Sequence, residues 1–143
     1  MKKMSLVGFA LFVCLAPMSA GGADFDGSRP LLCALVDIME CDPGAGCKEV
    51  TAESINAPGF LKINFKDKQI STTREKGTQR VTPIKGVGHL DGKLVLQGMD
   101  EGVEGERGGL AWSLAISEDT GKMILTASGE QVGFVVFGGC TTF

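Results

Sequence analysis

Apolar and polar positions alternate with a period of two from Phe60 onward, which is typical of half-buried β-strands. In residues 60–65, "FLKINF", the apolar residues Leu61, Ile63 and Phe65 alternate with the polar residues Lys62 and Asn64. Short apolar runs of similar character follow at 69–73, 80–90, 93–99, 110–117, 122–128 and 132–140. Together these segments predict about six or seven strands joined by short turns, in an antiparallel meander.

Three local signals refine this prediction. Asp91-Gly92 lies between two of the runs and predicts a type I′ hairpin turn, because both residues tolerate a positive φ. Pro83 has no backbone N–H, so we expect its strand to be an edge strand or to be broken there. The last run, 132–140, is apolar on both faces, which favours a central strand or one that lines a barrel.

The stretch before this region, residues 27–44, fits a helix better than a strand. Ser28 would cap the helix, Pro30 would lie in its first turn, and Asp42-Pro43-Gly44 would end it. The apolar positions on one helical face would be Leu31, Leu32, Leu35, Ile38 and Met39. As a strand its alternation fails, because apolar residues fill both sides. We therefore expect a mainly β (α+β) fold, with one N-terminal helix packed on an antiparallel meander or small up-and-down β-barrel.

Residues 1–23 have the pattern of a secretory signal peptide. Two lysines precede an apolar stretch, 6–16, that is too short to span a bilayer, and small residues follow it. Cleavage after Ala20 or after Ala23 would satisfy the small-residue rule, and we favour Ala23. The mature chain, residues 24–143, is then expected to be one domain, located in the periplasm or secreted, without membrane insertion.

Charge and composition narrow the classes of partner. The full chain has a net charge of −3, and the loss of Lys2 and Lys3 with the signal peptide makes the mature chain more acidic. An acidic chain without a basic block disfavours nucleic acid and anionic membrane surfaces. The single tryptophan, Trp112, and the absence of tyrosine disfavour a surface on which sugars or bases stack.

Four cysteines remain in the mature chain, and an even number in an exported protein predicts two disulfides with three possible connectivities. The turn sequence "DPGAG" can bring Cys41 and Cys47 close enough to bridge, which leaves Cys33 for Cys140. A zinc site and a redox pair are the alternatives. Both are disfavoured, because the chain has one histidine and no C-x-x-C spacing. We therefore expect no metal and no cofactor.

Four motifs, "PLLCA", "LVLQG", "WSLAIS" followed by "DTG", and "FVVFGGC", resemble a family of small uncharacterised exported proteins from proteobacteria. The similarity extends over most of the mature chain. It implies export, and it brings no activity, cofactor or catalytic residue with it.

His89 is the one imidazole that could transfer protons, and Ser113 or Ser117 could in principle join it. However, the chain has neither a G-x-S-x-G elbow nor a known signature of a cysteine nucleophile. A lone histidine just before a hairpin turn is more often an exposed strand residue. We therefore predict no catalytic residues and disfavour an enzyme.

The run 110–117 places Leu110, Trp112 and Leu114 on one face, as candidates to line a ligand cavity. Packing of this face into an ordinary core is the alternative. We rank first a non-catalytic module that binds a small apolar or amphipathic ligand on this face.

The glycine-rich segment 100–109 concentrates acidic residues, which suggests three roles: a calcium site, a solvated loop or a contact with an envelope protein. Its spacing does not match an EF-hand loop. A protein-interaction or envelope-maintenance module that uses this segment is therefore our second hypothesis. Its candidate residues are Asp100, Glu101, Glu104 and Glu106.

Overall fold

The computed structural model describes residues 24–73, 79–102 and 108–143. Within these ranges the chain forms nine β-strands and no helix. The strands are β1 (Leu31–Asp42), β2 (Gly46–Val50), β3 (Phe60–Asn64), β4 (Gln69–Thr73), β5 (Gln79–Leu90), β6 (Lys93–Asp100), β7 (Leu110–Ser117), β8 (Lys122–Ser128) and β9 (Gly133–Thr142). The mainly β prediction is confirmed. The expected signal peptide, residues 1–23, lies outside the described residues.

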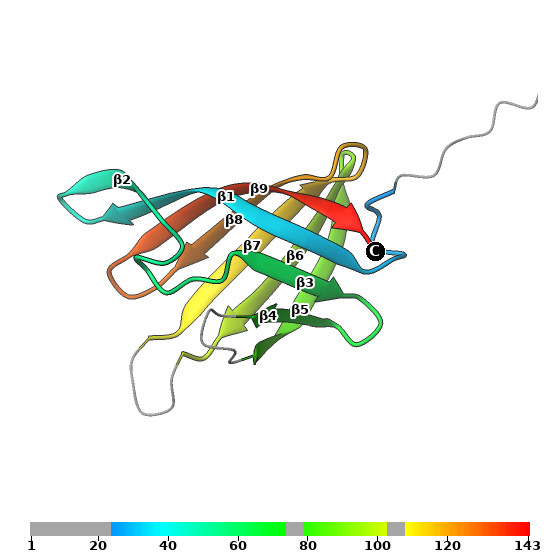
Figure 1. Ribbon diagram of the computed structural model, residues 1–143, viewed down its shortest axis with the longest axis horizontal. Helices are drawn as coiled ribbons and strands as arrows, with labels where there is room; N and C mark the ends of the chain where they lie inside the picture. The colour runs from blue at the N-terminus through cyan, green and yellow to red at the C-terminus, as the bar shows by residue number, and fades with distance from the viewer. Residues whose placement is uncertain (1–23, 74–78, 103–107) are drawn as a thin grey trace, which may run out of the picture.

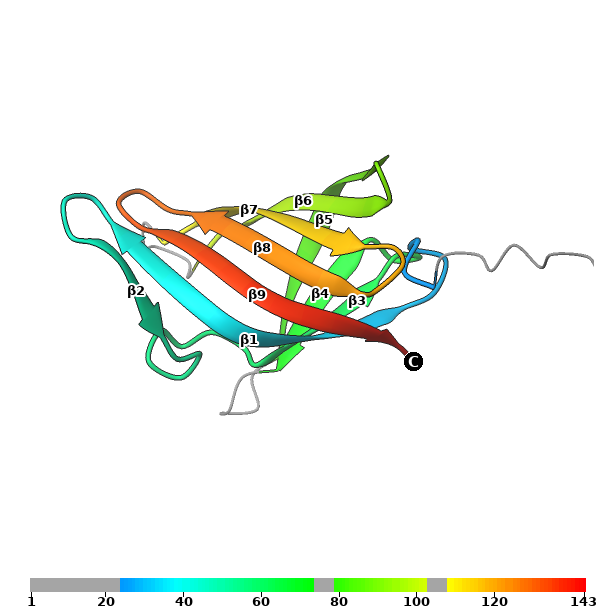
Figure 2. The ribbon, with the colours of Figure 1, turned by 90° about the horizontal axis from the view of Figure 1, so that it is seen from above.

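The strands close into an eight-stranded antiparallel barrel, because β1 pairs with β9 as well as with β3 (Figures 1 and 2). β2 and β3 pair with the same edge of β1, β2 along its second half and β3 along its first half. They therefore occupy one strand position in the wall, interrupted by residues 51–59. We call residues 51–59 the cap segment.

The predicted N-terminal helix is wrong: the apolar part of residues 27–44 is strand β1. Leu31, Cys33 and Ile38 point into the barrel and are buried, whereas Val36 is 69% exposed on the outside. A β-bulge between Leu35 and Asp37 shifts the inward positions by one residue. The resulting spacing of inward apolar residues imitates a helical face, and it also destroys the simple alternation expected of a strand.

The structure confirms the turn predicted at Asp91-Gly92 and one of the two alternatives predicted at Pro83. Asp91 and Gly92 form a two-residue connection between β5 and β6, with φ values of 49° and 68°, as a type I′ turn requires. Pro83 does not mark an edge strand, since β5 lies between β4 and β6. Its strand is nevertheless interrupted there: pairing with β4 ends at Pro83, and a bulge follows in the pairing with β6.

One half of the barrel interior is filled by large apolar side chains, and we call it the packed half. Its fully buried side chains are Leu31, Cys33, Ile63, Leu94, Leu96, Leu114, Ile116 and Met123. The segment before β1 closes this half: Phe25 packs against the core, and its backbone N–H donates to the Glu118 carbonyl at 3.3 Å. A Cβ on Gly121 would lie 2.7 Å from the Phe25 ring, so only glycine fits beneath it.

Two disulfides join the strands, with the pairing that the turn sequence favours. Cys33 and Cys140 lie opposite each other on β1 and β9 and are 107 residues apart in the chain. This bridge links two strands, not a helix to a strand as expected. Cys41 and Cys47 cross-link the β1–β2 hairpin, with a sequence separation of 6. In the part of the chain that the structure describes, no helix is long and apolar enough to cross a membrane.

Candidate ligand-binding cavity

The other half of the barrel interior contains a cavity of about 210 Å³, and we call it the cavity half. It is bounded by β1, β3–β9 and the cap segment. Its lining residues are Leu35, Ile38, Ile55, Asn56, Ala57, Pro58, Leu61, Ile70, Thr72, Arg80, Thr82, Asp100, Leu110, Trp112, Leu125, Ala127, Phe134 and Val136. The cavity therefore lies at the end of the barrel opposite the one that Phe25 closes, and we call Phe25 the plug of the packed half.

One wall of the cavity is apolar. It is built by side chains of β1, β7, β8 and β9, and Ala127 is the smallest of them. Ala127 lies directly opposite Trp112 in the β7–β8 pairing. A small side chain beside a large one leaves space that the backbone of a closed barrel cannot fill by collapsing. This pairing therefore helps to keep the cavity open.

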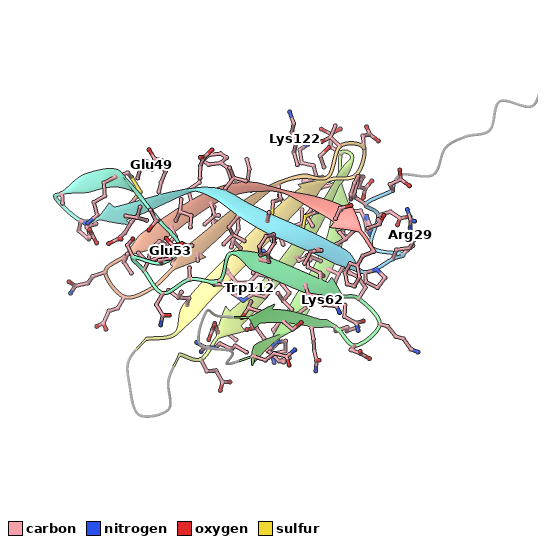
Figure 3. All side chains as sticks on the ribbon, viewed as in Figure 1. Arg29, Glu49, Glu53, Lys62, Trp112 and Lys122 are labelled. Carbon is pink, nitrogen blue, oxygen red and sulfur yellow. A yellow bond between two sulfur atoms is a disulfide. The ribbon has the colours of Figure 1, made fainter. Side chains whose placement is uncertain are left out.

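Trp112 is held in this wall by Gly98, its direct partner on β6. A Cβ built on Gly98 would lie 2.2 Å from Cζ2 and 2.7 Å from Cε2 of the indole, so the ring covers the glycine. Figure 3 shows the Trp112 side chain between the strands of the barrel. Gly98 therefore provides the space that fixes the position of the indole in the cavity wall.

The facing wall, on β4, β5 and β6, carries the charged and hydroxyl side chains of the barrel strands that line the cavity, together with Ile70. Thr72 and Arg80 lie opposite each other in the β4–β5 pairing, and Thr82 is the next inward residue of β5. Arg80 forms a salt bridge with Asp100 at the end of β6. The cavity is thus amphipathic, with an apolar wall and a wall that offers hydroxyl groups and one ion pair.

The cap segment covers the mouth of the cavity between β2 and β3. Ile55, Asn56, Ala57 and Pro58 line the cavity from this side. The segment has internal structure, because the Ala57 N–H donates to the Ala52 carbonyl at 2.8 Å. A further bond, from the Leu35 N–H to the Gly59 carbonyl at 3.0 Å, ties its end to β1. The cap is therefore anchored to β1, which is one of the four strands of the apolar wall.

The structure divides the predicted Trp112 face between the two halves of the barrel. Leu110 and Trp112 line the cavity. Leu114, the third predicted ligand-binding residue, has no exposed surface and belongs to the packed half, where it does not line the cavity. Both interpretations of this face, cavity wall and core, thus apply to different residues of the same strand.

Sequence reasoning missed the polar wall. Arg80, Thr82 and Ile84 occupy successive inward positions of β5, which is an alternation the sequence already contains. A charged residue at a position that shares its face with a core isoleucine is the signal that could have identified Arg80. The cap residues have no comparable signal, because they belong to an irregular segment.

Of the acidic segment 100–109, the structure describes residues 100–102 and 108–109. Asp100 is paired with Arg80 in the cavity wall, and only a quarter of its side chain is exposed. Glu101 is exposed. Glu104 and Glu106 lie outside the described residues. Within the described part of the segment, Asp100 is therefore part of the cavity wall.

His89 lies away from the cavity, beside the β5–β6 turn of the packed half. Its Nδ1 is 2.5 Å from Glu118 Oε1, and over half of its side chain is exposed. Nearby, hydrogen bonds from the Ser28 side chain and backbone lower the pKa of Asp26 below its usual value. Among the residues that the structure describes, no three His, Cys, Asp or Glu side chains are grouped so that they could hold a metal ion.

No protein-family model, curated protein or solved structure matches this chain.

Proposed function

We propose that this protein is a binding module that holds a small apolar or amphipathic ligand in the cavity half of its barrel. The observation that carries this proposal is the contrast inside one barrel. One half is filled by side chains, and the other encloses about 210 Å³ beside Trp112. Concave sites lined mainly by apolar groups, with a few polar groups placed among them, are the usual form of small-molecule sites.

The cavity volume sets the size of the apolar part of the ligand. An engineered apolar cavity of about 150 Å³ holds benzene. A cavity of about 210 Å³ therefore suits a single ring or a short alkyl chain rather than a large lipid. The polar wall and the cap segment would contact whatever polar group the ligand carries.

We further propose that the protein works outside the cytoplasm, in the periplasm or as a secreted protein. Two disulfides support this location, because such bonds persist in oxidising compartments. Thiol titration of the unreduced, denatured protein isolated from the envelope fraction tests it. We expect no reactive thiols, and free thiols at Cys33 or Cys140 would contradict it.

The experiment on ligand binding uses 1-octanol as the probe and Trp112 as the reporter. The chain has one tryptophan and no tyrosine, so its indole emission comes from the cavity wall. We expect 1-octanol to shift this emission in a saturable way and to give a one-to-one complex by native mass spectrometry.

A matched pair of variants locates the site. Ala127→Leu places a larger side chain in the cavity opposite Trp112, whereas Ala111→Leu makes the same change at an exposed position of β7. We expect Ala127→Leu to abolish octanol binding while the barrel stays folded, and Ala111→Leu to bind as the unmodified protein does. Unchanged binding by Ala127→Leu would show that the probe binds elsewhere.

A further inference from the structure

The ion pair between Arg80 and Asp100 provides the only charged side chains among the described residues that line the cavity. Arg80 and Asp100 have side chains that are 27% and 25% exposed, so both are largely withdrawn from water. Besides its bond to Asp100, Arg80 Nη2 donates to the Gly102 carbonyl at 2.5 Å. Asp100 Oδ1 accepts a second bond, from the Gly102 N–H at 3.0 Å. The pair is thus fixed at the end of β6.

These contacts involve only one nitrogen of Arg80 and one oxygen of Asp100. A guanidinium has five N–H donors, and a carboxylate has two oxygen acceptors. With respect to the described residues, Nη1 and Nε of Arg80 and Oδ2 of Asp100 make no hydrogen bond. Because Arg80 and Asp100 both line the cavity, this wall offers N–H donors and a carboxylate acceptor, together with the hydroxyl groups of Thr72 and Thr82.

The charges of the pair cancel, and this decides which head group the wall can accept. A charged head group that leaves water for this cavity would lose its hydration and find no net counter-charge. A neutral group that both donates and accepts would lose less, and it could bond to both members of the pair.

Resting on the proposed function, we propose that the ligand is an uncharged amphipathic molecule with a hydroxyl or amide head. The head accepts a hydrogen bond from Arg80 and donates one to Asp100. The apolar part lies against the wall formed by β1, β7, β8 and β9, in contact with Trp112.

Three probes with the same tail test this assignment: 1-octanol, octanoate and octylammonium. Their dissociation constants for the unmodified protein are measured at neutral pH by Trp112 emission and by calorimetry. We expect 1-octanol to bind more tightly than either ion, by about tenfold or more. Octanoate cannot donate to Asp100 and octylammonium cannot accept from Arg80, so each ion loses one hydrogen bond to a charged group, which contributes that much. Equal or tighter binding of octanoate would overturn the assignment and would make Arg80 a simple counter-ion.

Two variants unbalance the pair in opposite directions. Asp100→Asn leaves the positive charge of Arg80, so octanoate should become the tightest probe. Arg80→Gln leaves the negative charge of Asp100, so octylammonium should become the tightest probe. An unchanged order of the three probes in both folded variants would contradict the role of the pair, even if 1-octanol still bound.

Arg29 and Asp24 provide the matched control. They form an exposed salt bridge at 2.9 Å and do not line the cavity, and Figure 3 shows Arg29 at the edge of the molecule, away from Trp112. Arg29→Gln and Asp24→Asn change the net charge by the same amounts and should leave the order of the probes unchanged.

The two proposals fail in different ways. If no octyl probe binds in a manner that Ala127→Leu abolishes, the proposed function is wrong. If the probes bind in the cavity but the ion is preferred, only the head-group assignment is wrong. The probe order in the unmodified protein decides this even if a variant does not fold.

Discussion

The two halves of the barrel are built by the same strands and differ in the size and polarity of their inward side chains. Along β7, Leu114 and Ile116 are completely buried, whereas Trp112 and Leu110 face the cavity. Along β5, Ile84 is buried, whereas Thr82 and Arg80 face the cavity. On both of these strands the change takes place between successive inward residues. The cavity therefore lies where the inward side chains of these two strands become polar or aromatic, at the end of the barrel where the cap segment interrupts one strand position of the wall.

The largest effect is expected when the disulfides of the two halves are removed in turn. Cys33–Cys140 belongs to the packed half and closes a loop of 107 residues, whereas Cys41–Cys47 closes a loop of 6. On the chain-entropy model, the double alanine variants should lose about 5 and about 2 kcal/mol of unfolding free energy, respectively. Urea denaturation under non-reducing conditions measures both losses. Equal losses would mean that the closure of the barrel does not depend on the long bridge.

A second comparison truncates two leucines that face each other in the β7–β8 pairing. Leu114 is fully buried in the packed half, whereas Leu125 is partly exposed to the cavity. Leu114→Ala should cost about 2–5 kcal/mol of unfolding free energy, and Leu125→Ala clearly less, because part of its surface already lacks packing partners. Only Leu125→Ala should alter octanol binding. A larger loss for Leu125→Ala would contradict the division of the barrel into two halves.

A smaller effect is expected at the glycine beneath Trp112. Gly98→Ala puts a Cβ within the volume of the indole and should cost about 1–3 kcal/mol, as overpacking does elsewhere. It should also move the indole and shift its emission. Gly88→Ala in β5 is the control, because a Cβ there meets nothing within 4 Å. If both variants leave the emission unchanged, Gly98 does not position Trp112.

The smallest effect concerns Asp26, near the plug of the packed half. Its pKa is lowered in the folded state by Ser28, so its contribution to stability is present above the unfolded pKa of 3.8 and is lost as the pH falls through the lower folded value. Asp26→Asn should therefore slightly reduce the unfolding free energy at pH 7, and this difference should disappear in strong acid. Octanol binding should not change in this variant. A difference in stability that grows on acidification would have the wrong sign.

The strands that follow Phe60 could be predicted because each one keeps its alternation and is bounded by turn residues such as Asp91-Gly92. β1 could not be predicted, because its bulge combines two alternating halves into a pattern with helical spacing. β2 was missed because its five residues are mostly exposed and carry no core pattern. The strand count therefore rose from the expected six or seven to nine.

For the candidate site, the sequence identified the Trp112 face but not where along it the cavity begins. Leu110 and Leu114 both occupy inward positions in the alternation of 110–117. Only the residues that surround them in the barrel make one a cavity residue and the other a core residue. Arg80 and Asp100 are 20 residues apart and meet because the β5–β6 hairpin brings them to the same end of the barrel. Such a contact depends on register and bulge position, which local patterns do not contain.

The bridge between the first and last strands of the barrel also has a mechanical consequence. Tension applied at the two ends of the folded chain would pass from Cys33 directly to Cys140, since the covalent link is the shortest path between them. The chain between these residues, with both walls of the cavity and the cap, would carry almost none of that load. Pulling on the oxidised molecule should therefore extend only the residues before Cys33 and after Cys140, and the barrel between them should keep its fold until the bond is reduced.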